Sequence, residues 1–232
     1  MAKFYGIGVG PGDQDLLTLK AVKVLNLIDV LLIPNTKKEK LGVAEIIVSA
    51  HLKDSIERVY IDFPMVSDER VFEEAGNHAA KVIEPLIASG KNVGFVTLGD
   101  ASVYSTYGYI VKALSQEVEI ETIPGITSFC AAAALANRPL VEKDEILTII
   151  PMNATDEQID RALAVSDAFV FMKIYKREER VLNHLKKHGL EKDGILAQRC
   201  GFKDASIHKD LAESLIANED YLTLVLSRKE SK

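Results

Sequence analysis

Apolar segments of strand length alternate with amphipathic segments of helix length from one end of the chain to the other. Runs such as 29–33 and 168–172 have the length and composition of buried strands, whereas apolar residues recur at helical spacing over 15–28. This alternation is typical of an α/β fold with mainly parallel sheets. About ten strands are expected, which is too many for one open sheet in a chain of 232 residues.

The strand count therefore favours two small α/β domains, each a mainly parallel sheet flanked by helices. The best boundary is the short, polar and acidic stretch at residues 115–121, which divides the chain into domains over 1–117 and 118–232. No low-complexity linker separates the two halves, so we expect the domains to pack closely.

Several helix ends are marked by single residues. Thr155 and Gln158 form the sequence of a capping box, and Gly189 is placed to end a later helix. Another helix is expected over 104–115. Pro85 falls inside a further helical pattern and should kink it.

The composition is that of an ordinary folded protein, with 47% hydrophobic and 27% charged residues. It excludes a disordered, collagen-like or disulfide-rich chain. The chain has no run of about 20 apolar residues, so no membrane span is expected, and residues 1–6 have no secretory leader pattern. Cys130 and Cys200 lie far apart without CxxC spacing, which argues against structural zinc and favours a reducing, cytoplasmic location.

The charge balance is mildly acidic, with 28 Lys and Arg against 34 Asp and Glu and a net charge of −6. Such a protein has no general attraction to nucleic acid or to anionic membranes. An acidic small substrate would need local basic groups. Lys37, in the charged loop 37–40, is a candidate, although a plain exposed loop explains this segment as well.

The five histidines show no HExxH motif of a catalytic metal site. His184 and His188 lie four residues apart on one predicted helix face, which is a spacing that could bind a metal. No third ligand is near them in the sequence, so we expect a solvated helix face and no protein-bound metal. The charged segment 176–180 is likewise expected at the surface.

Three loops that follow predicted strands are rich in glycine and small hydroxyl residues. They span 8–13, 97–106 and 124–129. In open α/β sheets, ligands collect beyond the carboxyl ends of the strands. Glycines let a ligand approach the backbone, and N–H groups at a following helix N-terminus can bind an anionic group.

Two common phosphate-binding motifs do not match these loops. A Walker loop needs Gly-Lys-Ser/Thr, whereas this chain has Gly12-Asp13-Gln14, and the aspartate would repel phosphate. A dinucleotide fingerprint needs GxGxxG opening a helix directly. Here Pro11 interrupts the glycines, and no acid follows the second strand to hold a ribose.

The three loops together resemble those of a known family, the tetrapyrrole (corrin and porphyrin) methylases, which use S-adenosylmethionine. The matching segments occur in order along essentially the whole chain: 8–13 (Gly-Val-Gly-Pro-Gly-Asp), 98–100 (Leu-Gly-Asp) and 124–128 (Pro-Gly-Ile-Thr-Ser). Any one of them alone would be a weak signal.

A finer resemblance points to the precorrin-2 C20-methyltransferases of cobalamin (vitamin B12) biosynthesis. It lies in 16–21 (Leu-Leu-Thr-Leu-Lys-Ala) and in 97–100 followed by 104–107 (Tyr-Ser-Thr-Tyr). Ala101 and Gln14 stand where that group typically has proline. Each change loosens a turn and removes no functional group.

The resemblance implies a class III methyltransferase with its active site in the cleft between two domains of a homodimer. The donor would be S-adenosylmethionine, and the substrate precorrin-2 or cobalt-factor II, methylated at the C20 meso carbon. No catalytic residue is identified. By position, the resemblance assigns the donor to Pro11, Leu98, Gly99, Asp100, Val103, Thr127, Ser128, Met172, Cys200 and Thr223, and the substrate to Asp13, Tyr104, Tyr107 and Lys37.

Plainer explanations compete for several of these residues. Glycines 8–12 could form only a tight turn, Asp100 could cap the following helix, Thr127 and Ser128 suit a first helical turn, and Met172 suits a core. Two other functions stay open. One is methylation of another ring position or of a non-tetrapyrrole substrate, and the other is a non-catalytic nucleotide-binding module.

Overall fold

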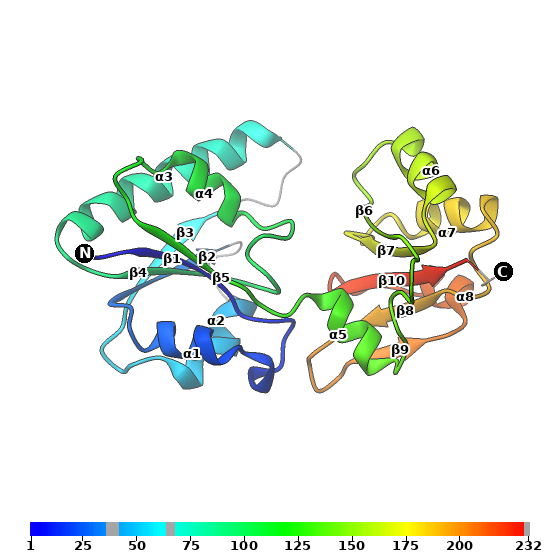
Figure 1. Cartoon of the computed structure of the whole chain (residues 1–232), viewed down its shortest axis with the longest axis horizontal. Coiled ribbons are helices and arrows are strands. Elements are labelled where there is room, and N and C mark those ends of the chain that lie inside the picture. Colours follow the sequence, from blue (N-terminus) through cyan, green and yellow to red (C-terminus); the bar gives the residue numbers. More distant parts are fainter. Residues whose placement is uncertain (36–41, 64–67, 230–232) are drawn as a thin grey trace. The chain divides into compact units, whose positions relative to one another are not determined.

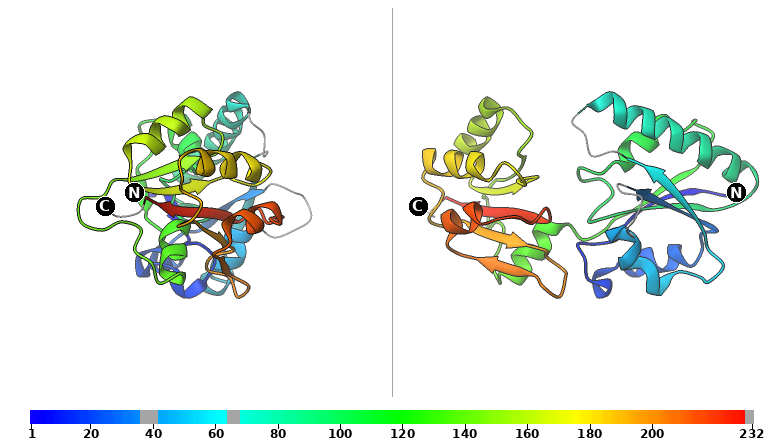
Figure 2. Two further views of the ribbon diagram at one scale, coloured as in Figure 1. Left: turned by 90° about the vertical axis from the view of Figure 1, so that its right-hand side faces the viewer. Right: turned by 180° about the vertical axis from the view of Figure 1, so that it is seen from behind.

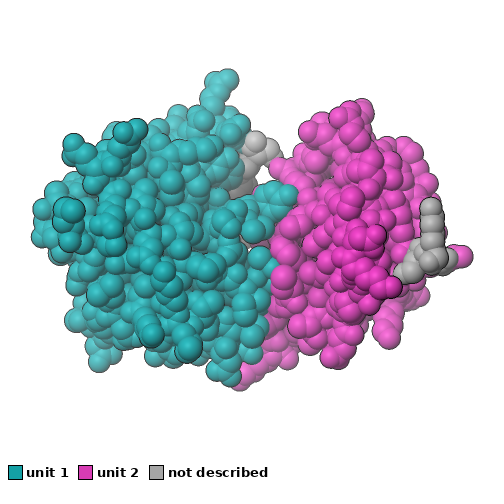
Figure 3. Space-filling model, in the orientation of Figure 1, with its two compact units in different colours: residues 1–127 teal, residues 128–232 magenta. Residues whose placement is uncertain are grey.

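The chain folds into two compact units, Met1–Thr127 and Ser128–Lys232 (Figure 3). The computed structural model describes residues 1–35, 42–63 and 68–229. The expected boundary after residue 117 is too early, because strand β5 (Ile120–Ile123) pairs with the first strand of the chain and so completes the first sheet.

The sheet of unit 1 is parallel throughout and has the strand order β3-β2-β4-β1-β5 (Figure 1). This confirms the parallel sheet expected from alternating strands and helices. Besides β5, its strands are β1 (Phe4–Gly8), β2 (Val30–Asn35), β3 (Glu57–Asp62) and β4 (Val93–Thr97).

Helices cover both faces of this sheet (Figures 1 and 2). The period of two in a strand separates the side chains: Tyr5 and Ile7 join the core beneath α1 and α2, whereas Phe4 and Phe95 join the core beneath α3 and α4. The helical segments are η1 (Gln14–Leu16), α1 (Leu19–Leu25), α2 (Val43–Val48), η2 (Ser49–His51), α3 (Glu69–Ala88) and α4 (Tyr107–Ala113).

The structure bears on two helix predictions in unit 1, the start of the helix expected over 104–115 and the helix that contains Pro85. The helix expected from residue 104 starts at Tyr107 instead, because Tyr104 has a left-handed backbone with φ of 48°. Asp100 therefore does not cap this helix. Helix α3 continues through Pro85 to Ala88.

The sheet of unit 2 has the order β6-β7-β10-β8-β9, and only β6 and β7 are parallel. The second α/β unit is thus confirmed, but its sheet is mixed rather than mainly parallel. The connection 199–205 between β8 and β9 is too short for a crossover helix, so these strands pair antiparallel. The strands are β6 (Leu147–Pro151), β7 (Ala168–Met172), β8 (Ile195–Gln198), β9 (Ser206–His208) and β10 (Thr223–Arg228).

Four helices flank this second sheet: α5 (Ser128–Leu135), α6 (Asp156–Val165), α7 (Glu178–Lys187) and α8 (Leu211–Ile216). The capping box of Thr155 and Gln158 is present, and Gly189, with φ of 67°, follows the end of α7 as predicted. Strand β9 and helix α8 were not predicted, because both are short. No helix in the described part of the chain is long and apolar enough to span a bilayer.

Candidate functional site

The three glycine-rich loops converge at one edge of the first sheet. Strands β4, β1 and β5 are parallel neighbours, so the loops after them meet beyond their carboxyl ends. Gly10 and Gly99 join two of these loops: the Gly99 N–H donates to the Gly10 carbonyl at 2.7 Å, and the Gly10 N–H donates to the Gly99 carbonyl at 3.1 Å.

Two glycines at this edge are required by close packing of the backbone. A Cβ atom on Gly8 would lie 2.7 Å from the Gly125 nitrogen, and one on Gly125 would overlap the Gly99 carbonyl oxygen. Gly99 differs, because its φ of 73° favours glycine while a Cβ there would point into open space. Close packing alone therefore explains Gly8, whereas the backbone at Gly99 is open to its surroundings.

Asp100 ties the loop after β4 to the loop after β5. Its Oδ1 accepts hydrogen bonds from the Ser102 N–H at 2.8 Å and from the Ser102 hydroxyl, and its Oδ2 accepts one from the Gly125 N–H at 2.8 Å. Burial opposes ionisation of this carboxyl, but the hydrogen bonds from Ser102 and Gly125 outweigh burial and lower its pKa. Asp100 is thus an ionised brace of the edge.

The other donor candidates of unit 1 lie on the same loops. Pro11 is buried beside Gly10, while Leu98 and Val103 are half-buried. The Thr127 hydroxyl oxygen is buried and makes no hydrogen bond to any described residue. A buried polar atom without a partner is costly, so this hydroxyl suits a bound polar ligand.

The substrate candidates fall in different environments. Asp13 is exposed, and its Oδ1 accepts the Asp15 N–H at 2.9 Å. Tyr104 is 47% exposed. Lys37 lies outside the described residues.

Tyr107 belongs to the core of unit 1 rather than to a substrate surface. Its ring stacks on Phe95 at a centroid distance of 6.4 Å, and its hydroxyl lies 2.7 Å from the Thr122 hydroxyl oxygen. A Cβ on Gly6 would collide with this ring. The expected substrate role of Tyr107 is therefore replaced by a structural one.

In unit 2, one edge of the sheet holds the remaining donor candidates except Ser128, which begins α5. Met172 ends β7. Because β10 runs antiparallel to β7 and β8, its first residue, Thr223, lies at the same edge, and Cys200 follows the end of β8 there. The structure thus brings Met172, Cys200 and Thr223 to one edge, although they are distant in sequence.

The Met172 carbonyl and the Thr223 hydroxyl already form hydrogen bonds within unit 2. The Met172 carbonyl accepts the Met152 N–H at 2.8 Å. The Thr223 hydroxyl donates to Asn218 Oδ1 at 3.0 Å and to the Asp220 carbonyl at 2.8 Å. Burial raises the pKa of the Cys200 thiol to about 11, so it stays protonated and is no nucleophile at neutral pH.

Asn218 is a buried residue of this edge that sequence reasoning missed. Its Oδ1 accepts hydrogen bonds from Gln198 Nε2 at 2.8 Å and from Thr223, and its Nδ2 donates to Glu178 Oε1 at 2.8 Å. The side chain thereby joins β8, β10 and the start of α7. A single asparagine in a polar loop carries no pattern that predicts this role.

The expectation of a solvated face at His184 is wrong. This side chain is 7% exposed, with Nδ1 2.9 Å from Asp160 Oδ1 and Nε2 3.0 Å from Asp156 Oδ1. His188 Nε2 lies 3.0 Å from the same Asp160 oxygen. These contacts brace α6 against α7. Within the described ranges, no group of three His, Cys, Asp or Glu side chains is placed to hold a metal ion.

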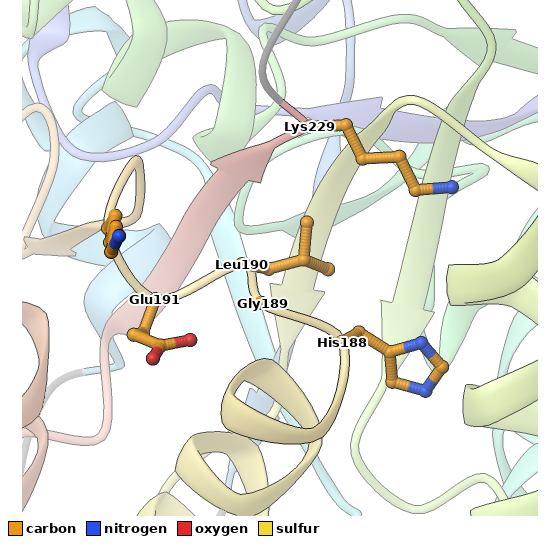
Figure 4. Close-up of a pocket in the computed structure, with 6 residues that line it drawn as sticks. His188, Gly189, Leu190, Glu191 and Lys229 are labelled. Carbon is orange, nitrogen blue, oxygen red and sulfur yellow. The ribbon is translucent and has the colours of Figure 1, made fainter.

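An open pocket of about 520 Å³ lies at the opposite edge of the second sheet, beyond the end of β10 (Figure 4). His188, Leu190 and Lys229 line it, and none of the described donor or substrate candidates does. This pocket is therefore separate from the strand ends discussed above.

A family model supplies the deciding comparison. The model of the tetrapyrrole (corrin/porphyrin) methylases matches residues 3–216. The chain belongs to this family. It is accordingly an S-adenosylmethionine-dependent tetrapyrrole methyltransferase, which confirms the family resemblance of its three loops.

Individual relatives of this methyltransferase agree with the family. The chain is 32% identical over 232 residues to a cobalt-precorrin-2 C(20)-methyltransferase of Salmonella typhimurium, covering 98% of this chain and 97% of the relative. It is 29% identical to a precorrin-2 C(20)-methyltransferase of a Sinorhizobium species, with coverages of 97% and 95%. The solved structure of a cobalt precorrin-4 methyltransferase aligns with a TM-score of 0.74 at 25% identity, over 97% of this chain and 94% of that one.

Features of the strand ends fit the methyl donor of this methyltransferase. The buried Thr127 hydroxyl lacks a partner among the described residues, and Gly99 offers open backbone. A sulfonium cation is also compatible with the ionised Asp100 nearby. The loops of unit 1 thus present a polar atom, open backbone and a negative charge, which are features that such a donor would need.

Proposed function

We propose that the chain methylates the C20 meso carbon of precorrin-2 or cobalt-factor II in cobalamin biosynthesis. The observation that carries this proposal is the likeness to two C20-methyltransferases over nearly the whole length of each. The segments 16–21 and 104–107 support it from the sequence.

In this proposal the donor-binding residues are those that the family resemblance assigns in each unit. Unit 1 supplies the backbone of Leu98 and Gly99, the carboxylate of Asp100, and the Thr127 hydroxyl. Unit 2 supplies Met172 and Thr223 from its sheet edge. Pro11, Val103, Ser128 and Cys200 complete the proposed set.

S-adenosylmethionine, when bound, supplies a methyl group whose bond to sulfur breaks as the electron pair stays on sulfur. The task of the chain is to hold the ring carbon in line with that methyl group and to exclude water. The hydrogen bond from Gly125 to Asp100 fixes the loops after β4 and β5 relative to each other. Such fixed geometry lowers the entropic part of the barrier.

C-methylation also releases the proton of the ring carbon. Three substrate candidates on the strand-end loops, Asp13, Tyr104 and Tyr107, carry groups that could accept a proton, but Tyr107 is committed to the core of unit 1. Asp13 and Tyr104 keep exposed side chains on the strand-end loops, and burial raises the pKa of Tyr104. Neither is assigned as the base.

The decisive experiment incubates the purified protein with S-adenosylmethionine and either precorrin-2 or cobalt-factor II. One further methyl group at C20 is expected, located by mass spectrometry and NMR. The preferred substrate tells whether the ring carries cobalt on entry. Methylation at another carbon supports the alternative within the family, and no methylation of either ring rejects the C20 assignment.

The proposal also includes a homodimer that works in the cytoplasm. Sedimentation velocity tests the dimer, and a monomer that retains full activity would contradict it. Membership of the methylase family already argues against the other alternative, a non-catalytic nucleotide-binding module.

A further inference from the structure

The loop between β7 and α7, residues 173–177, is unusually basic and strained. It follows Met172 directly and so lies at the sheet edge that holds Thr223. Lys173 and Lys176 both have left-handed backbones, with φ of 59° and 61°. Left-handed conformations cost free energy for residues with a Cβ and concentrate at functional sites.

Two cations of this basic loop 173–177, Lys176 and Arg177, differ from others in unit 2. Arg180 pairs with Asp156 at 2.7 Å, and Arg199 pairs with Asp204 at 2.7 Å. Arg177 forms no ion pair with a carboxylate in the described part of the chain. The Lys176 ammonium lies 5.4 Å from the centre of the Tyr175 ring rather than beside an acid.

Glu178, the acid nearest to the loop in sequence, does not form an ion pair with the side chain of Lys176 or Arg177. Glu178 Oε1 accepts the Lys176 backbone N–H at 3.1 Å and Asn218 Nδ2 at 2.8 Å. Its carboxylate therefore holds the loop to the rest of unit 2.

The positive charges of Lys173 and Arg177 repel each other. Burial lowers the pKa of the Lys173 ammonium, and the positive charge of Arg177 lowers it further. Repulsion between these groups is relieved when an anion binds near both of them. Arginine is well suited to such binding, because its guanidinium donates two parallel hydrogen bonds to one carboxylate.

We propose that the basic loop 173–177 binds the peripheral carboxylates of the tetrapyrrole substrate, with Arg177 as the main contact. This inference rests on the proposed function only for the class of substrate, not for the carbon methylated. It addresses a difficulty raised by the net charge of −6, since an acidic protein needs a local basic surface to hold a carboxylate-rich ring.

The test measures binding of uroporphyrin, a stable and fluorescent tetrapyrrole with many carboxylates, to the full chain at low salt. Arg177→Gln is expected to weaken binding by about tenfold or more, because a charge-assisted hydrogen bond is lost. Lys173→Asn should also weaken binding, because it removes a second positive charge from the loop. Asparagine is chosen because it tolerates the left-handed backbone at this position. Lys186→Gln, an equal loss of charge at an exposed position on α7, is the matched control and should change binding less than twofold.

Two further measurements separate the possible outcomes. Calorimetry with S-adenosylhomocysteine should give unchanged affinity for Arg177→Gln, and Arg177→Lys should recover part of the uroporphyrin binding. The proposal is wrong if Arg177→Gln binds uroporphyrin like the Lys186 control, or if only S-adenosylhomocysteine binding falls, which would assign the loop to the donor's carboxylate. Because uroporphyrin binding requires no methyl transfer, these outcomes do not depend on the C20 assay.

Discussion

The two units hold their strand-end loops by different means. In unit 1 the loops after β1, β4 and β5 meet through bare glycine backbone, and the Asp100 side chain ties two of them together. In unit 2 the corresponding edge is joined by side chains around Asn218. The first edge should therefore be sensitive to added atoms, and the second to the loss of a hydrogen bond.

The difference follows from the sheets. All five strands of unit 1 are parallel, so three loops leave the same edge and crowd together. In unit 2 the antiparallel β10 begins where β7 and β8 end. The edge there combines two strand ends with one strand start, and hydrogen-bonded polar side chains connect them.

The largest effect is expected from adding one methyl group to the crowded edge. Gly125→Ala would place its Cβ against the Gly99 carbonyl oxygen and the Gly8 backbone, which belong to two other loops. We expect unit 1 to lose about 3 kcal/mol or more of stability. Hydrogen exchange with mass spectrometry can follow peptides from each unit separately.

Gly108→Ala is the control for this substitution. Gly108 lies within α4, and a Cβ there has open space, so alanine should be neutral or stabilise by up to about 1 kcal/mol. If Gly125→Ala were as stable as Gly108→Ala, the edge of unit 1 would be looser than the close packing of its glycines indicates.

A smaller effect is expected from removing the central side chain of the other edge. Asn218→Ala leaves Gln198 Nε2 without a partner. It also removes one of two hydrogen bonds from Glu178 Oε1 and one of two acceptors from the Thr223 hydroxyl. Unit 2 should lose about 1–3 kcal/mol. Unit 1 should exchange as in the wild type.

The same substitution tests whether this edge serves the donor. The affinity for S-adenosylhomocysteine should fall for Asn218→Ala, because Thr223 and Glu178, the first residue of α7, each lose a hydrogen bond that positions them. Asn183→Ala, at an exposed position of α7, provides the control and should leave stability and affinity unchanged. Equal affinity for the two variants would remove Thr223 from the proposed donor set.

Much of the fold could be predicted from local patterns. The alternation of strands and helices gave two α/β units, and the capping box at Thr155 and the glycine after α7 are where they were expected. The mixed second sheet could not be predicted, because strand direction there depends on the short β8–β9 connection and on the insertion of β10 between β7 and β8. Neither leaves a periodic signal in the sequence.

The site was predictable only where chemistry follows a motif. The three glycine loops meet as expected, because motif residues followed parallel strands. Tyr107 was misplaced because its loop motif runs into a helix whose buried face starts at that residue. Asn218 was missed, and His184 was wrongly expected on a solvated face, because their partners, such as Gln198 and Asp160, are distant in sequence.

The smallest expected effect is a loss of stability at low pH, which we expect in unit 2 because of Asp160. In unit 2, hydrogen bonds from Lys187 and His188 hold the pKa of Asp160 well below its usual value, and His184 adds to them. A lowered folded-state pKa adds stability that is complete above the unfolded pKa, about 4, and is lost as the pH falls through the folded value. Unit 2 of the wild type should therefore lose protection from hydrogen exchange as the pH is lowered below about 4.

Asp160→Asn tests this assignment, because its amide cannot ionise. The variant should begin less stable at neutral pH, and its unit 2 should lose less stability than the wild type on acidification. Asp144→Asn changes an exposed carboxyl of the same unit and should keep the wild-type pH profile. If both variants followed the wild-type profile, the contacts between α6 and α7 at Asp160 would contribute nothing to acid sensitivity. The comparison of the two units would then rest on Asn218 alone.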